Sequence, residues 1–206
     1  MTENILQQQT ELARLIGQHS GDNGVFETAI PSLFVIRYTH VSEPAYRVYK
    51  PSLCVIAQGS KEVLLAQERF EYSSAEYLIS SMNLPVVGQI ITASPEVPYL
   101  SFKLEFTQDL ILEVMNDSKL PITSKENAKR ALFVGEMEFS LMDAILRLVR
   151  LLDSPNDIPY LAPLFIKEIL YKLLRARSNS RSSSDCTRLG ASCYLNLRKR
   201  QMLPFG

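Results

Sequence analysis

The strongest constraint on the fold of this chain is a series of short apolar segments between Val25 and Phe106, separated by turn-forming residues. The segments are rich in Val, Ile, Leu, Tyr and Phe, and Pro, Gly, Ser and Asn occupy the gaps between them. They cover residues 33–38, 52–57, 61–66, 69–72, 76–82, 85–92 and 98–106. Many short strands at this spacing predict an antiparallel sandwich or barrel.

Two of these segments indicate which faces of the strands are covered. In 98–106, apolar side chains from Leu100 to Phe106 occupy every second position, which predicts a strand with one apolar face. The segment 52–57, SLCVIA, is apolar at nearly every position, so we expect it to be covered on both sides.

Helical periodicity flanks the predicted strands. Residues 4–17 have the pattern of a short amphipathic helix, and 107–117 predict a helix with Thr107 as its N-cap. Residues 136–153 and 159–175 predict a helical hairpin. An apolar stripe on its first helix is either packed on the sheet or used as a dimer contact, and it consists of Met137, Leu141, Ile145, Leu148 and Leu152.

The charge of the chain is unevenly distributed although its net value is zero. Seven of the 22 basic residues and one of the 22 acidic residues follow position 174, so residues 1–174 carry 15 basic and 21 acidic side chains. An acidic body is a poor match for a phosphate backbone. Without a signal pattern or an apolar run long enough to span a bilayer, the sequence predicts a cytoplasmic protein that does not enter the membrane.

Little in the sequence points to catalysis. The two histidines, His19 and His40, share no metal-ligand spacing, and we expect no metal and no cofactor. Cys54 lies in the strand expected to be buried, where an apolar environment keeps a thiol protonated and inert. The three cysteines form no recognisable disulfide framework or zinc pattern.

Polar side chains within or beside strands are the candidates for binding a small ligand, because such pockets are mostly apolar with a few placed polar groups. A solvated outer face is the alternative for each of them. The predicted ligand-binding residues are Arg37, Tyr49, Gln58, Tyr77, Gln89 and Tyr99.

The ordered series PSLCVIAQGSK, EYLISS, LPVVGQI, ASPEVPYL and DIPYLAPLFIKEILYKLL resembles the N-terminal domain of AraC-type bacterial transcription regulators, and the resemblance covers roughly residues 1–175. It implies an α+β fold, in which a cupin-like antiparallel β-barrel of jelly-roll type senses a small-molecule effector and a C-terminal helical hairpin forms a homodimer. The resemblance carries over no ligand residue. At Ser73–Ala75 the sequence departs from the Pro-Gly turn that is common in the family.

This interpretation divides the chain into four parts: a helical arm (1–24), the sensor barrel (25–106), a helical dimerisation region (107–175) and a basic, Ser-rich tail (176–206). The family also implies a DNA-binding domain with two helix-turn-helix units. Residues 176–206 are too few and too irregular for it, so we expect that domain to be missing here. A shifted reading frame near codon 176 or a native disordered tail would each explain the change.

Two other functions remain open from the sequence. A metal-free cupin enzyme such as a sugar isomerase would need an acid–base pair, for which Glu62, Glu71 and Glu76 are the available carboxylates. Weak, salt-sensitive binding of nucleic acid through the tail, which contains RKR at 198–200, is the other.

Overall fold

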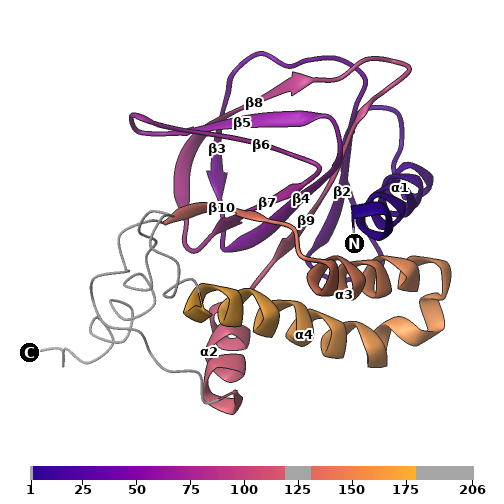
Figure 1. The fold of residues 1–206 in the computed structure, drawn as a ribbon, viewed down its shortest axis with the longest axis vertical. Helices are drawn as coiled ribbons and strands as arrows, with labels where there is room; N and C mark the ends of the chain where they lie inside the picture. The colour runs from indigo at the N-terminus through magenta and orange to yellow at the C-terminus, as the bar shows by residue number, and fades with distance from the viewer. Residues whose placement is uncertain (1, 119–130, 180–206) are drawn as a thin grey trace, which may run out of the picture.

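The computed structural model describes residues 2–118 and 131–179, which form two antiparallel sheets with helices against one of them (Figure 1). The elements are α1 (Thr2–His19), β1 (Gly24–Glu27), β2 (Leu33–Tyr38), β3 (Ala45–Tyr49), β4 (Ser52–Gln58), β5 (Ser60–Leu65), β6 (Glu68–Ser73), β7 (Glu76–Ser80), β8 (Leu84–Thr92), β9 (Tyr99–Glu105), α2 (Gln108–Asp117), β10 (Leu132–Glu136), α3 (Phe139–Arg150), two short 3-10 turns (Leu151–Asp153 and Pro155–Asp157) and α4 (Ile158–Asn179). The predicted tail, apart from its first residues, lies outside the described part of the chain.

The two sheets face each other as a sandwich. The larger has the strand order β1-β2-β9-β4-β7-β10, and the smaller has the order β3-β8-β5-β6. The α+β fold predicted from the sequence is confirmed, but the sheets do not close into a barrel, because no described strand of one pairs with a strand of the other. The turn at Ser74–Ala75 passes from the smaller sheet to the larger one instead of closing a hairpin.

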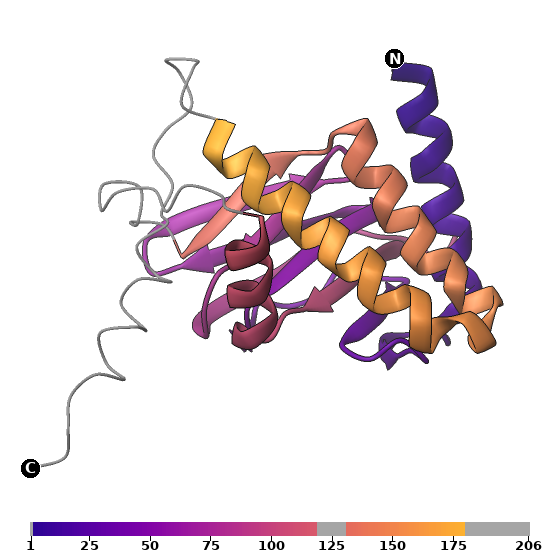
Figure 2. The same cartoon turned by 90° about the horizontal axis from the view of Figure 1, so that it is seen from below.

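Helices cover the outer face of the larger sheet. α1 packs on β2, β4 and β9, α3 packs on α1, and α4 packs on α3 (Figure 2). The predicted N-cap of α2 is confirmed, since the Thr107 hydroxyl accepts a hydrogen bond from the Leu110 backbone amide at 3.2 Å. The predicted arm and hairpin therefore exist, and together they bury one face of the larger sheet.

The larger sheet is buried on its other face as well. On β9, Leu100, Phe102 and Leu104 face the helices, whereas Tyr99 and Ser101 face the smaller sheet with exposed fractions of only 1% and 2%. The expectation of a single apolar face on this strand was therefore wrong, because a second sheet covers what looked like a polar face. The expectation that β4 is covered on both sides is confirmed.

Three strands were not predicted from the sequence: β1, β3 and β10. Of these, β10 lies in the region that we expected to be entirely helical, and it pairs with β7 at the edge of the larger sheet. Gly135 leaves room for the Tyr77 side chain across this pairing, because a Cβ atom there would lie 2.5 Å from the end of the Tyr77 ring. A five-residue strand next to a strongly periodic helix gives too weak an alternation to be recognised.

The apolar stripe of α3 packs inside the protomer. None of its five side chains is more than 8% exposed, and all belong to the core between the larger sheet and the helices: Met137, Leu141, Ile145, Leu148 and Leu152. Of the two roles considered, packing on the sheet describes these residues. A second copy of the chain would have to contact other faces of the helices.

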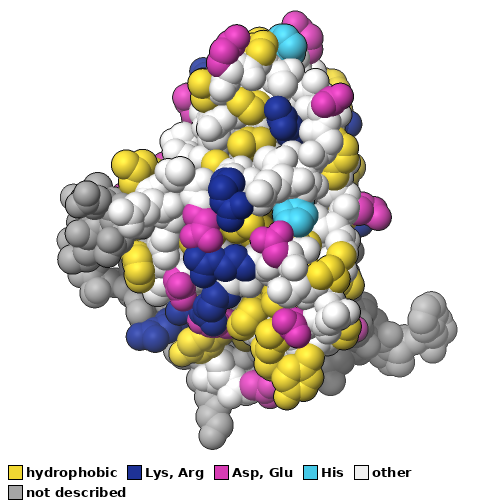
Figure 3. Space-filling view, turned by 90° about the vertical axis from the view of Figure 1, so that its right-hand side faces the viewer, with side chains coloured by type: hydrophobic (Ala, Val, Ile, Leu, Met, Phe, Trp, Pro, Cys, Tyr) yellow, Lys and Arg dark blue, Asp and Glu magenta, His cyan; other side chains and the backbone are white. Residues whose placement is uncertain are grey.

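Ion pairs join the helices to one another. Arg150 of α3 donates two hydrogen bonds to Glu11 of α1, at 2.8 and 2.7 Å, and Arg147 donates one to Glu168 of α4 at 2.7 Å. Basic and acidic side chains accordingly lie next to one another on the face that carries α1 (Figure 3). A bidentate arginine–carboxylate pair fixes orientation as well as distance, so α1 is held against α3 in one arrangement.

A strained turn at Gly59 carries the chain from the larger sheet to the smaller. Its φ is +84°, and a Cβ atom would lie 2.5 Å from the Thr92 carbonyl oxygen. We expect Gly59→Ala to lower the free energy of unfolding by about 1–3 kcal/mol, measured by urea denaturation. Gly17→Ala in α1 is the control, because nothing lies within 4 Å of the added atom and alanine favours the helix. Equal stability of the Gly59→Ala variant and the wild type would contradict this account of the turn.

Candidate functional site

The space between the two sheets is filled by a second apolar core, separate from the core under the helices. Two large tyrosine side chains lie in it, and each is 1% exposed. Its buried members are Ile56, Val63, Tyr72, Leu78, Leu84, Val86, Ile90, Tyr99 and Leu132. Tyr49 and Cys54 pack at its margin. An enclosed apolar layer with a few phenol groups has the composition of a small-ligand site.

Strand alternation brings a cation to this layer. Val63 of β5 belongs to the layer, and Lys61, two residues earlier, lies on the same side of the strand. Its Nζ atom is 5.5 Å from the centre of the Tyr49 ring, within the range of a cation–π contact. Among the described residues, no carboxylate forms an ion pair with Lys61.

The Lys61 and Tyr49 side chains converge above Gly88 of β8. A Cβ atom on Gly88 would lie 3.5 Å from the Tyr49 hydroxyl oxygen and 3.8 Å from Lys61 Nζ, which are ordinary contact distances. The Tyr49 hydroxyl oxygen is buried, and no described residue forms a hydrogen bond with it. A buried hydroxyl without a partner loses the free energy of its hydrogen bond to water, so it marks a position that a ligand can complete.

Burial keeps the phenols of this layer neutral. It raises the pKa of Tyr99 to about 12, although the Lys61 ammonium and a hydrogen bond with Ser101 oppose that rise. Burial likewise raises the pKa of Tyr49 and of Tyr72. The tyrosines can therefore donate and accept hydrogen bonds at neutral pH but supply no negative charge. Burial also raises the pKa of the Cys54 thiol, which argues against a nucleophilic role.

The predicted ligand residues divide between this layer and other parts of the molecule. Tyr49 and Tyr99 lie in it. Gln58 is tied to a turn, since its Nε2 atom donates a hydrogen bond to the Pro98 carbonyl at 2.7 Å. Tyr77 belongs to the core under the helices, where its ring meets that of Phe133 edge to face.

The other two predicted residues, Arg37 and Gln89, lie outside the layer. Arg37 alternates with Ile36 and Tyr38, which pack against the layer, and Gln89 alternates with its buried member Ile90. The sequence prediction missed Lys61, Tyr72 and Gly88. The alternation of Lys61 with Val63 in KEVLLA was a usable signal for the first of these.

Two of the three carboxylates considered for an enzyme, Glu62 and Glu71, lie on the outer face of the smaller sheet, away from the layer. Glu62 and Glu71 lie opposite each other across β5 and β6, and both contact Arg69. Glu76 accepts a hydrogen bond from the Ser73 backbone amide at 3.2 Å. No cluster of three or more His, Cys, Asp or Glu side chains suited to a metal ion occurs in residues 2–118 and 131–179.

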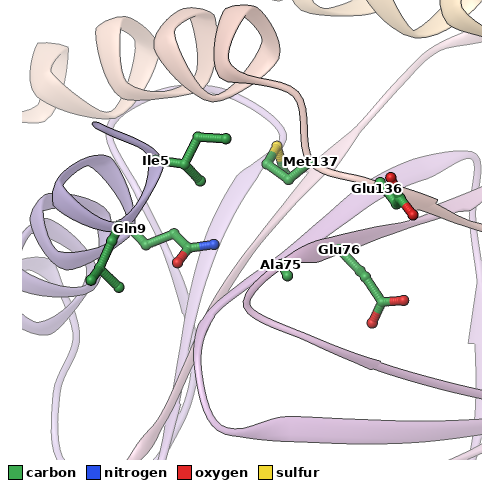
Figure 4. A pocket seen from close by; sticks show the side chains of 7 residues that line it. Ile5, Gln9, Ala75, Glu76, Glu136 and Met137 are labelled. Atoms are coloured by element: carbon green, nitrogen blue, oxygen red, sulfur yellow. The ribbon is translucent and has the colours of Figure 1, made fainter. Parts of the chain in front are cut away.

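A hollow of about 680 Å³ lies at the surface between the start of α1, the turn before β7 and the end of β10 (Figure 4). It is lined by Ile5, Leu6, Gln9, Ala75, Glu76, Glu136 and Met137. The Gln9 side chain donates a hydrogen bond to the Ser74 carbonyl. None of the residues predicted to bind a ligand lines this hollow, and it lacks the tyrosines of the inner layer.

The raised pKa of Tyr99 predicts a loss of stability at alkaline pH. The unfolded chain releases a tyrosine proton near pH 10, whereas folded Tyr99 holds it to about pH 12. The contribution is therefore fully present below about pH 10, and it falls by about 1.4 kcal/mol for each unit of the interval up to the folded pKa. Urea unfolding at about pH 9 and about pH 11 should show a smaller loss for Tyr99→Phe than for the wild type.

The control for this measurement is Tyr46→Phe, which alters a tyrosine that is 87% exposed. Its loss of stability should equal that of the wild type. Identical pH dependence of the two variants would show that Tyr99 is not held in its neutral form by burial.

Comparison with known proteins agrees with the family resemblance of the sequence. The model of the family described as the AraC-type transcriptional regulator N-terminus matches residues 29–181, well over half of the chain. No curated protein sequence matches this chain.

Solved structures of two regulators are similar to it. ToxT from Vibrio cholerae, with an unsaturated fatty acid bound, is 10% identical, with a TM-score of 0.48, and the match covers 81% of this chain and 58% of that one. The AraC-like transcriptional activator CuxR is 11% identical, with a TM-score of 0.46, and the match covers 84% of this chain and 63% of that one. The chain therefore spans less than two thirds of either regulator. From the family match, this chain belongs to the AraC-type transcriptional regulators and carries their N-terminal domain.

Proposed function

We propose that this chain is a ligand-sensing and dimerising module of an AraC-type regulator, and that its effector binds between the two sheets. The observation that carries the proposal is the buried, unpartnered Tyr49 hydroxyl at the margin of an apolar, tyrosine-containing layer. A regulatory role without catalysis is in keeping with the positions of Glu62 and Glu71, which pair with Arg69 on the outer face of the smaller sheet.

The larger sheet offers a physical route from such a ligand to the helices. Tyr99 faces the ligand layer, and its neighbour Leu100 packs in the core under the helices. A ligand that displaces β9 by a fraction of an ångström would therefore change the packing of α1 and α3 on the sheet's other face. Close-packed cores respond to such shifts by repacking, which is how effector sites act at a distance.

We further propose that the outer face of α4 contacts a second copy of the chain. Tyr160 and Leu164 are one helical turn apart on this face and are 78% and 52% exposed. Two large apolar side chains in adjacent positions are a typical component of a dimer contact. They take the role that the sequence prediction gave to the stripe from Met137 to Leu152, which is buried in the protomer.

The predicted absence of a DNA-binding domain stays a prediction, since it rests on the sequence of residues 176–206 alone. We propose that the module works by pairing with another copy of the chain. None of the helices in the described part of the chain is long and apolar enough to span a membrane. We propose the cytoplasm, where bacterial DNA lies, as its location.

A small-molecule screen tests the location of the effector site. Compounds that raise the thermal midpoint of the wild type should bind about five- to tenfold more weakly to Tyr49→Phe, because the ligand would lose its hydrogen bond to the Tyr49 hydroxyl and one hydrogen bond contributes about 1 kcal/mol. Gln89→Ala is the control, since it removes a strand polar group that lies outside the layer. A greater loss of binding in the Gln89→Ala variant would move the site to the outer face of the smaller sheet.

Sedimentation velocity tests the dimer contact. The wild type should form dimers, and the double variant Tyr160→Glu/Leu164→Glu should remain monomeric, because two carboxylates would be buried without partners. The control is Val41→Glu, because Val41 is an apolar loop residue that is itself 60% exposed. This variant should dimerise like the wild type. Monomeric wild-type protein at every concentration would refute the proposed contact.

A further inference from the structure

The charges that face the space between the sheets are not balanced. Lys103 of β9 pairs with Glu105 at 2.7 Å, and Lys50 pairs with the same carboxylate at 3.1 Å. Lys61 of β5 has no such partner among the described residues, and its ammonium group lies 5.5 Å from the centre of the Tyr49 ring. A partly buried ammonium without a counter-ion is unfavourable, because the surrounding apolar groups replace the water that would solvate it.

The groups around Gly88 are donors. The Lys61 ammonium can only donate hydrogen bonds, and the neutral Tyr49 hydroxyl has its proton available for donation. No side chain grows from Gly88, so an atom there can meet both groups at contact distances of 3.5 Å and 3.8 Å. Two donors that converge on one open position, one of them charged, are suited to an oxygen that carries negative charge.

The number of charges narrows the class of anion. Lys61 is the one cation placed beside Gly88, and its single charge matches a monoanion such as a carboxylate. A phosphate dianion would bring a second negative charge to this position without a second cation beside it. The rest of the layer offers apolar surface, including Val63, Val86 and Ile90. A ligand that fits both parts has one acidic end and an apolar body.

We propose that the effector is a small organic carboxylate, with its acidic group held by Lys61 and Tyr49 above Gly88 and its apolar body lying between the sheets. This inference rests on the proposed function, because it assigns a chemical class to the same ligand layer. It distinguishes this chain from a sugar sensor, which would need several acceptors as well as donors.

Matched pairs of probes test the charge requirement. Octanoate and hydrocinnamate are titrated into the full chain by calorimetry, beside octanol and hydrocinnamyl alcohol, which have the same apolar bodies without the charge. We expect at least one carboxylate to bind about tenfold or more tightly than its alcohol, as a hydrogen bond to a charged group predicts. Lys61→Met should abolish this preference, and Lys61→Arg should retain it.

Control variants separate the effect of the Lys61 charge from that of the overall charge of the protein. Lys172→Met removes the same charge from α4, outside the sandwich, and should leave the preference intact. Tyr49→Phe should weaken carboxylate binding more than alcohol binding. Thermal melting of each variant shows that it is folded, and Lys61→Gln replaces Lys61→Met if the latter is not.

The outcomes of these experiments distinguish a failure of this inference from a failure of the proposed function on which it rests. Equal binding of carboxylates and alcohols, unchanged by Lys61→Met, would overturn the anionic class while leaving an effector site between the sheets. No carboxylate binding at all would also overturn it. If, in addition, compounds found by the screen bound Tyr49→Phe as tightly as the wild type, the effector site between the sheets would be refuted as well.

Discussion

The burial of the larger sheet on both faces is the constraint on which the rest of this structure depends. Strands β4 and β9 separate two cores, one against the helices and one against the smaller sheet. Each strand must therefore satisfy two packing partners with alternate residues. The helical arm, the hairpin and the smaller sheet are all held in place through this shared layer.

The pattern of short strands and flanking helices predicted most of the fold. The strands from Leu33 to Tyr38 and from Ser52 onwards, the Thr107 cap and the helical hairpin follow from local periodicity, which the sequence displays directly. β10 could not be predicted in this way, because it is stabilised by pairing with β7 and by the close approach of Tyr77 to Gly135. Such long-range contacts leave little trace in five residues.

The candidate site was harder to predict than the fold, for a related reason. Alternation separates Tyr99 from Leu100, but it does not say which of the two faces the smaller sheet. That depends on where the smaller sheet lies, and the same uncertainty explains why Tyr77 and Gln89 were grouped with Tyr49. Lys61 was missed because a lysine near a turn is usually solvated. Its unpaired state is visible only once Lys50 and Lys103 are both seen to pair with Glu105.

The unequal covering of the two sheets also bears on how such a sensor can evolve. A substitution on β9 changes a strand that packs both against the helices and against the smaller sheet. A change there that altered ligand specificity would therefore also lower the stability of the fold. In the described part of the chain no helix packs on the smaller sheet. Its inward positions Lys61, Val86 and Gly88 therefore do not also have to pack against a helix. We expect relatives with different effectors to differ in sequence chiefly on β5 and β8, and to differ less on β4 and β9.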